Sequence, residues 1–160
     1  MSAGPFSRVK YKDKVYNVGD FLLMREKNGG LLVCKLLEVI PYGGMPEYEE
    51  WPSIRVQWFY HNSELDLTKL GIPAEDRVFI GDNEIFESDY EEIVYIGFIA
   101  GKCDVLTIEQ YDQCQATTET TYYSRAKFIT KEDRLEPPYD KWETLCSCKK
   151  PMNPNMLTVG

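Results

Sequence analysis

The stretch that decides the fold is Ser53-Ile54-Arg55-Val56-Gln57-Trp58-Phe59-Tyr60-His61. A period of two predicts a β-strand with Ile54, Val56, Trp58 and Tyr60 on one face. The opposite face carries Arg55, Gln57, Phe59 and His61. Strand residues two apart lie roughly 7 Å from each other, so Trp58 and Tyr60 are placed to form adjacent walls of a pocket for a quaternary ammonium. The alternative is that both rings belong to the core.

The composition indicates one β-rich domain. The chain has 160 residues, 43% of them hydrophobic, with three Trp, eleven Tyr and seven Phe. A chain of this size buries a core large enough to fold alone. Aromatic and β-branched residues favour strands over helices.

The charge points to a basic partner. The formal net charge is −8 and the isoelectric point is about 4.8. Binding to nucleic acid through phosphates needs a basic face, so we expect no direct DNA binding, whereas clustered acids suit a Lys/Arg-rich tail. No stretch has the length and apolarity of a membrane span or signal peptide, so we expect no membrane contact.

The five cysteines indicate a reducing compartment, the cytosol or nucleus, because their number is odd and only Cys146 and Cys148 are close together. We expect Cys34 and Cys103 to be core residues.

Turn residues divide the rest of the chain into short strands. A hairpin is expected over residues 6–18, followed by strands over 21–25, 31–40, 84–86, 93–106 and 120–129. An acidic corner is expected over 89–92, and a long insertion with one helical turn over 62–82. Thr107 is expected to cap a helical turn, with Gln110 completing the capping box. Together these signals predict a mainly β fold, a distorted β-barrel with a few short helical turns.

The order of these segments resembles the bromo-adjacent homology (BAH) domain of chromatin proteins. The matching segments, in the order of the family, are 16–23, 32–38, 55–60, 83–90 and 99–105. The resemblance implies an N-terminal extension and hairpin over 1–14, a BAH domain over 15–138, and a further segment over 139–160.

That last segment resembles the opening of a PHD finger. It reads Leu145-Cys146-Ser147-Cys148-Lys149-Lys150-Pro151-Met152-Asn153-Pro154-Asn155, a Cys-x-Cys pair followed by a Pro-x-Asn-Pro turn. Structural zinc takes four ligands, so the resemblance implies zinc at Cys146 and Cys148 in a complete PHD finger and no cofactor in this chain. The alternative is two incidental cysteines in a tail.

The BAH resemblance implies an aromatic cage for methyl-lysine, with Trp58 and Tyr60 as two walls. A third wall of the family corresponds to Leu32, which offers apolar contact but no ring, so part of the cation–π attraction is lost. Substitute walls are Tyr42, Tyr48 or Trp51 on the adjacent loop. Tyr90 stands where the family has a histidine and is expected to close the cage; the alternative is an exposed loop tyrosine.

The resemblance also implies contacts to the bound peptide from Asp89 and its neighbours Ser88, Glu87 and Asp82. An acidic set without a basic residue surrounds them, namely Asp82, Glu84, Glu87, Asp89, Glu91 and Glu92. It suits a histone tail, and the alternative is a solvated acidic face.

Catalysis has little support in the sequence. His61 is the sole histidine, so Ser/His or Cys/His chemistry would depend on it, and it is expected to be a surface group. The glycine pairs lack the strand–loop–helix context of a phosphate-binding loop. We expect no enzyme activity.

The resemblance therefore implies a nuclear reader of histone methylation within chromatin repression and transcription regulation. The target it favours is the Polycomb mark, trimethylated lysine twenty-seven of histone H3. Other chromatin or repressor-complex proteins are expected partners. The alternatives are an interaction scaffold whose cage is degenerate at Leu32, and a BAH domain that binds nucleosomes, which the net charge of −8 disfavours.

Overall fold

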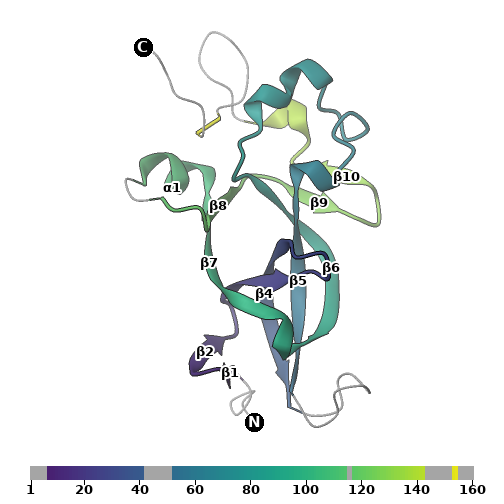
Figure 1. Cartoon of the computed structure of the whole chain (residues 1–160). Helices are drawn as coiled ribbons and strands as arrows, with labels where there is room; N and C mark the ends of the chain where they lie inside the picture. The colour runs from purple at the N-terminus through teal and green to yellow at the C-terminus, as the bar shows by residue number, and fades with distance from the viewer. Residues whose placement is uncertain (1–6, 42–51, 115–116, 143–152, 155–160) are drawn as a thin grey trace. The chain divides into compact units, whose positions relative to one another are not determined.

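The computed structural model describes residues 7–41, 52–114, 117–142 and 153–154. The chain forms two compact units, the first from residues 1–59 and 90–103 and the second from 60–89 and 104–160. Over the described residues the fold is mainly β, as the sequence predicts (Figure 1). The segment boundaries at 14/15 and 138/139 stay predictions.

The strands are β1 (Arg8–Tyr11), β2 (Lys14–Asn17), β3 (Phe21–Arg25), β4 (Leu31–Ile40), β5 (Ser53–His61), β6 (Ile85–Tyr95), β7 (Ile99–Thr107), β8 (Thr121–Ser124), β9 (Lys127–Ile129) and β10 (Arg134–Glu136). The helical turns are η3 (Asn62–Glu64), η4 (Ala74–Phe79), η5 (Ile96–Phe98), α1 (Ile108–Gln113) and η6 (Tyr139–Lys141). Strands β5, β6 and β7 each continue from one unit into the other.

The first unit is an antiparallel sheet with strands in the order β5, β4, β3, β7. Cys34 of β4 pairs with Trp58 of β5 and with Leu22 of β3. Antiparallel partners share a face, so the alternating apolar positions of the three strands meet in one core. That core includes Ile54 and Val56, both fully buried. The predicted phase of the β5 strand is therefore confirmed.

The predicted N-terminal hairpin is confirmed as the antiparallel pair β1–β2. Its two turn residues, Lys12 and Asp13, both have positive φ (49° and 66°), as a tight hairpin turn with the right twist requires. Tyr16 of β2 is buried in the core of the first unit, and Val9 and Tyr11 of β1 pack against that core.

The second unit contains the order β10, β9, β6 and the parallel pair β7–β8. The insertion after β5 forms η3 and η4 and buries Leu67, Leu70, Ile72 and Ile80. These side chains join Phe86 and Trp142 in one apolar cluster. The insertion is therefore a packed part of this unit's core.

Three predicted boundaries are wrong. The strand expected over 93–106 is the end of β6 followed by β7, separated by the helical turn η5. The acidic corner over 89–92 is part of the continuous strand β6, where the carboxylates of Asp89, Glu91 and Glu92 each have a partner that offsets their low strand preference. The strand expected over 120–129 is two strands, β8 and β9, interrupted where Arg125 binds Glu84. Strand β10 was not predicted.

Other local predictions are confirmed. The Thr107 side chain accepts from Gln110 N (3.1 Å) while the Gln110 side chain accepts from Thr107 N (2.9 Å), which caps α1. Cys34 and Cys103 are buried thiols, and burial raises the pKa of Cys34. Among the described helices, none has the length and apolarity to cross a membrane.

Candidate functional site

Trp58 differs from the residues that precede it on its face of β5. Ile54 and Val56 are fully buried, whereas Trp58 is half-buried and packs against the core of the first unit with part of its indole. The face of β5 therefore changes at Trp58 from core to a partly accessible ring. A partly accessible ring at the end of a buried strand face is what we expect of a residue that forms the wall of a pocket.

The Trp58 indole is anchored by Glu92 of β6, with Nε1 donating to Oε1 at 2.9 Å. The neighbouring Glu91 instead faces Arg55, 3.7 Å away, and Arg55 lies on the opposite face of β5 from Trp58. The two contacts agree that Glu92 and Glu91 point to opposite faces. Glu92 was predicted as a member of the acidic set, but its contact with Trp58 was not, because it links residues 34 apart in sequence.

Tyr90 and Leu32 share the face of Trp58 within the first unit. Tyr90 lies two residues before Glu92 on β6 and is 45% exposed. Leu32 lies two residues before Cys34, the partner of Trp58, so it is a diagonal neighbour of Trp58 at about 7–8 Å. Leu32 is half-buried. Three of the four predicted cage residues are thus on one face of one unit.

The fourth predicted cage residue, Tyr60, belongs to the second unit. Its ring meets Phe128 of β9 edge-to-face, with centroids 5.6 Å apart and planes at 83°. An edge-to-face contact of this kind helps to fix the orientation of the Tyr60 ring. The substitute walls Tyr42, Tyr48 and Trp51 lie outside the described residues.

The predicted peptide contacts differ in accessibility. Asp82 is exposed and Glu87 is half-buried, whereas Ser88 is fully buried. The Asp89 carboxylate accepts from Thr130, through N at 2.8 Å and Oγ1 at 2.6 Å. These hydrogen bonds lower the pKa of Asp89, so the carboxylate is ionised and tied to its own unit.

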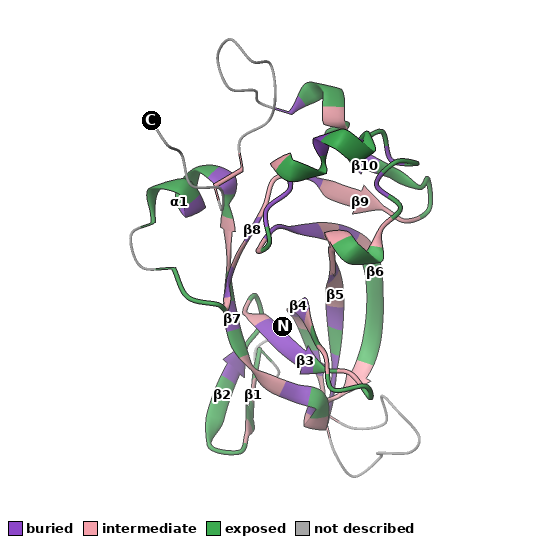
Figure 2. Cartoon of the chain, turned by 45° about the horizontal axis from the view of Figure 1, so that its top comes forward, coloured by how far each residue is buried: buried purple, intermediate pink, exposed green. Residues whose placement is uncertain are grey.

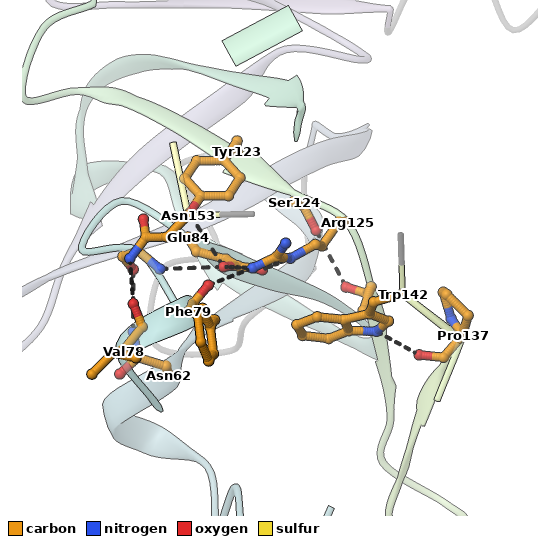
Figure 3. A network of polar contacts seen from close by, with 12 residues as sticks. Asn62, Val78, Phe79, Glu84, Tyr123, Ser124, Arg125, Pro137, Trp142 and Asn153 are labelled. Atoms are coloured by element: carbon orange, nitrogen blue, oxygen red, sulfur yellow. Dashed lines mark hydrogen bonds and ion pairs between the residues drawn. The ribbon is translucent and has the colours of Figure 1, made fainter. Parts of the chain in front are cut away.

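The interpretation of Glu84 as part of an acidic surface is wrong. Glu84 is fully buried and forms a two-pronged ion pair with Arg125, Nε to Oε2 at 2.8 Å and Nη2 to Oε1 at 2.9 Å (Figure 3). No local sequence pattern predicts this pair, because its residues are 41 apart. Burial raises the pKa of Glu84, while Arg125 and the hydrogen bonds from Gly81 N and Tyr123 OH act in the opposite direction.

Aromatic rings complete the surroundings of this pair. The Arg125 guanidinium lies over the Trp142 ring, 4.5 Å from its centroid, and Trp142 Nε1 donates to Pro137 O at 3.0 Å. Arg125 Nη2 also donates to Phe79 O at 2.7 Å (Figure 3). Removing one partner of a buried charge pair leaves the other charge uncompensated in the interior, so we assign this pair a structural role.

His61 also has a structural role. Its Nδ1 accepts from Ser63 N at 3.2 Å, and its backbone N–H donates to Glu64 at 2.9 Å, which forms a capping box for η3. Its Nε2 is then the protonated nitrogen and donates to Asp82 O at 3.1 Å. Within the described residues, no three His, Cys, Asp or Glu side chains are grouped as a metal site requires, and Cys146 and Cys148 lie outside them.

Comparison with known proteins identifies the family. The BAH domain model matches residues 14–138, most of the chain. The chain belongs to the BAH domain family. A curated relative, the "Chromatin remodeling protein EBS" of Arabidopsis thaliana, is 28% identical over 156 residues. The match covers 94% of this chain and 59% of that protein, so the chain spans about three fifths of the length of its relative.

A solved structure shows the same fold. The crystal structure of the yeast Rsc2 BAH domain superposes with a TM-score of 0.57 at 13% identity, over 81% of this chain and 52% of that one. The predicted BAH-like β fold is therefore confirmed.

Proposed function

We propose that this BAH domain is a chromatin reader that binds methylated lysine on a histone tail. The proposed cage is Trp58, Tyr60 and Tyr90, with Leu32 as an apolar wall. Asp82, Glu87 and Asp89 are proposed to face the peptide. Ser88 is not carried into this interface because it is fully buried.

The observation that carries the proposal is the Trp58–Glu92 hydrogen bond. A half-buried indole held by a carboxylate offers a ring face of fixed orientation, and Trp attracts cations most strongly among the aromatic side chains. The Glu92 carboxylate adds negative potential beside that ring. Both features favour a methylammonium over a neutral ligand.

The finer assignment rests on the family resemblance. We propose trimethylated lysine twenty-seven of histone H3 as the preferred mark, in Polycomb repression and transcription regulation, with other repressor-complex proteins as further partners. A nuclear location follows from this role and accords with the name of the Arabidopsis relative, a chromatin remodeling protein. No enzyme activity is proposed.

The PHD-like segment supplies a Cys-x-Cys pair at residues 146 and 148. Four ligands are needed for structural zinc, so these two thiols alone do not fit a zinc site. We propose that the pair would bind zinc only within a complete PHD finger.

Calorimetry with histone H3 tail peptides tests the function. We expect the trimethylated peptide to bind with a Kd of roughly 10 μM, about −7 kcal/mol, and the unmethylated peptide to bind at least tenfold more weakly. Trp58→Ala should abolish the difference between the two peptides. Trp58→Phe keeps a ring but loses the hydrogen bond to Glu92, so it should retain a smaller preference.

The methylated peptide must be compared across all four methylation states, because a general attraction to basic peptides would not distinguish them. Equal affinity for every state, unchanged by Trp58→Ala, would contradict the proposal. Thermal unfolding of each variant confirms that the fold is intact.

A specific observation favours a second function, an interaction scaffold for chromatin proteins. Leu32 places an alkyl group at the diagonal neighbour of Trp58, where the family carries a ring, and Tyr60 is engaged with Phe128. A scaffold would capture a chromatin partner without regard to histone methylation. A substitution at Leu32 can therefore distinguish a methyl-lysine reader from an interaction scaffold.

A further inference from the structure

The basic residues at the N-terminal end of the chain are concentrated on the β1–β2 hairpin. Its four cations, Arg8, Lys10, Lys12 and Lys14, are all exposed, and Asp13 is the one acid between them. The hairpin thus carries a local charge of +3 within a chain whose net charge is −8. Figure 2 shows exposed residues along both of its strands.

We propose that this hairpin, defined here as residues 8–17, contacts the phosphate backbone of double-stranded DNA. The inference is independent of the methyl-lysine cage. The overall charge argues against DNA binding, but phosphates respond to the cations within a Debye length, about 8 Å at physiological salt. The charge of the hairpin, and not the net charge of the chain, therefore determines whether this surface attracts DNA phosphates.

The hairpin cations have no acidic partners in the described structure. None of the four makes an ion pair with a described carboxylate, whereas Arg55, Lys69 and Lys102 are each paired with one. Within the residues that the structure describes, these four cations are therefore not neutralised by a carboxylate. The Lys12 Nζ lies over the Tyr11 ring, 5.5 Å from its centroid.

The hairpin is held firmly on the first unit. Val9, Tyr11 and Tyr16 face the core, and Val18 N donates to Ser7 O at 2.8 Å at the base of the hairpin. Asn17 N donates to the Asp20 carboxylate, also at 2.8 Å. Cross-strand partners share a face. Lys14 pairs with Tyr11 and, although exposed, lies on that side of the ribbon, whereas Arg8 and Lys10 lie on the outward face. A ribbon held in this way loses less entropy on binding.

The geometry of the ribbon suits DNA. A two-stranded β-ribbon is one of the elements that the major groove admits. Arg8 and Lys10 lie two residues apart on β1, roughly 7 Å, a length of helix axis over which one DNA strand carries about two phosphates, at about 3.4 Å of axis each. Lys12 lies at the tip of the hairpin in a left-handed conformation, which Gly or Asn adopts more readily. The tip therefore carries a positive charge at a position where the backbone conformation favours an uncharged residue.

The contacts expected from this ribbon do not depend on base sequence. Lysines bind phosphates as point charges, and the tip has no Asn, Gln or Arg to bind a base edge through two hydrogen bonds. An acidic protein segment is the competing partner, and a polyglutamate peptide tests for it.

Fluorescence anisotropy with a labelled 20-base-pair duplex tests the proposal on the full 160-residue chain. We expect micromolar affinity at 50 mM NaCl for two unrelated sequences alike. Three to four phosphate contacts predict a fall in affinity of about 40- to 150-fold between 50 and 200 mM NaCl. The triple variant Lys10→Gln, Lys12→Gln, Lys14→Gln should weaken binding at least tenfold and reduce the salt dependence to that of about one contact.

A matched control changes the net charge equally. Lys27→Gln, Lys131→Gln, Lys141→Gln alters three exposed lysines elsewhere and should weaken binding less than threefold. Replacing the hairpin lysines by arginine should retain binding, which shows that loss in the glutamine variant is loss of charge and not of fold.

Three results would overturn the proposal. The first is no DNA binding at 50 mM NaCl and 200 μM protein. The second is equal weakening by the hairpin triple and the control triple. The third is binding of a polyglutamate peptide as tightly as DNA at the same salt, which would assign the hairpin to an acidic protein.

Discussion

The indole nitrogen of Trp58 donates a hydrogen bond of 2.9 Å to the carboxylate of Glu92. It joins β5 to β6 within the first unit and satisfies the single polar atom of a half-buried ring. A tryptophan without this acceptor would have a polar group partly removed from water and a freer ring. The contact therefore makes Glu92 a positioning residue for the proposed cage.

Replacement of Glu92 by alanine should weaken binding of the trimethylated histone peptide about fivefold. The loss corresponds to about 1 kcal/mol, the usual contribution of one hydrogen bond, because the Trp58 ring loses its anchor. Titration calorimetry measures the effect. The intrinsic fluorescence of the chain should change as well, because the surroundings of the Trp58 indole become more mobile.

Two variants separate anchoring from charge. Glu92→Gln keeps an acceptor for Trp58 but removes the negative charge. Its affinity for the trimethylated peptide should therefore lie between that of Glu92→Ala and that of the unchanged chain. Glu91→Ala removes the neighbouring carboxylate on the opposite face, beside Arg55, and should leave peptide affinity unchanged. Equal effects of Glu91→Ala and Glu92→Ala would show that Glu92 acts only through general charge.

The part of the site that follows strand periodicity could be predicted from the sequence. The two-residue period of β5 places Ile54 and Val56 in the core and Trp58 on the same face, as the structure confirms. The hydrogen bond to Glu92 could not be predicted, because strand pairing brings together residues that no local pattern connects. The sequence likewise does not show that Ser88 is buried.

The second unit shows the same limit. Acidic residues are usually exposed, which predicts a surface position for Glu84, yet Glu84 pairs with Arg125 in the interior. The pairing also explains the break between β8 and β9, which a propensity argument does not detect. Long-range ion pairs of this kind override the local preference of acidic residues for the surface, and no periodic pattern in the sequence indicates them.

Substitution of Glu84 by glutamine should lower the free energy of unfolding by about 3–5 kcal/mol. The change leaves the Arg125 guanidinium buried without its counter-charge, which is the costly way to break a buried pair. Urea unfolding monitored by circular dichroism measures the loss. Arg125→Met should be similarly damaging, because it leaves the Glu84 carboxylate unpaired.

An exposed ion pair is the matched control. Arg134 contacts Glu132 with side chains that are 45% and 58% exposed, and such pairs contribute about 0–1 kcal/mol. Glu132→Gln should therefore barely change the unfolding midpoint. A loss for Glu84→Gln no larger than that for Glu132→Gln would show that water reaches the Glu84–Arg125 pair.

Asp89 should make the stability of the chain depend on acid pH. Hydrogen bonds from Thr130 hold the pKa of its carboxyl below the ordinary value of 3.8. A depressed pKa in the folded state stabilises the fold fully above the unfolded value, and this stabilisation is lost as the pH falls through the folded value. Asp89→Asn should therefore lower the melting temperature at pH 7, with the difference from the unchanged chain shrinking below about pH 4.

Thermal unfolding from pH 7 to pH 2 measures this dependence. Asp112→Asn is the control, because Asp112 is exposed on α1, and its difference from the unchanged chain should be small at every pH. A difference for Asp89→Asn that stays constant over the whole range would contradict the assignment of the Thr130 hydrogen bonds as the cause.

Leu32→Tyr should convert a weak cage into a stronger one. Leu32 is half-buried and diagonal to Trp58 on one face of the sheet, so a ring placed there would add a wall worth about 0.5–2 kcal/mol, or roughly 2- to 30-fold in Kd for the trimethylated peptide. The control is Leu31→Tyr, at a 53% exposed position on the opposite face of β4, which should give no gain. If neither the unchanged chain nor Leu32→Tyr distinguishes methylated from unmethylated peptide, the cage is absent and the scaffold function is the correct one.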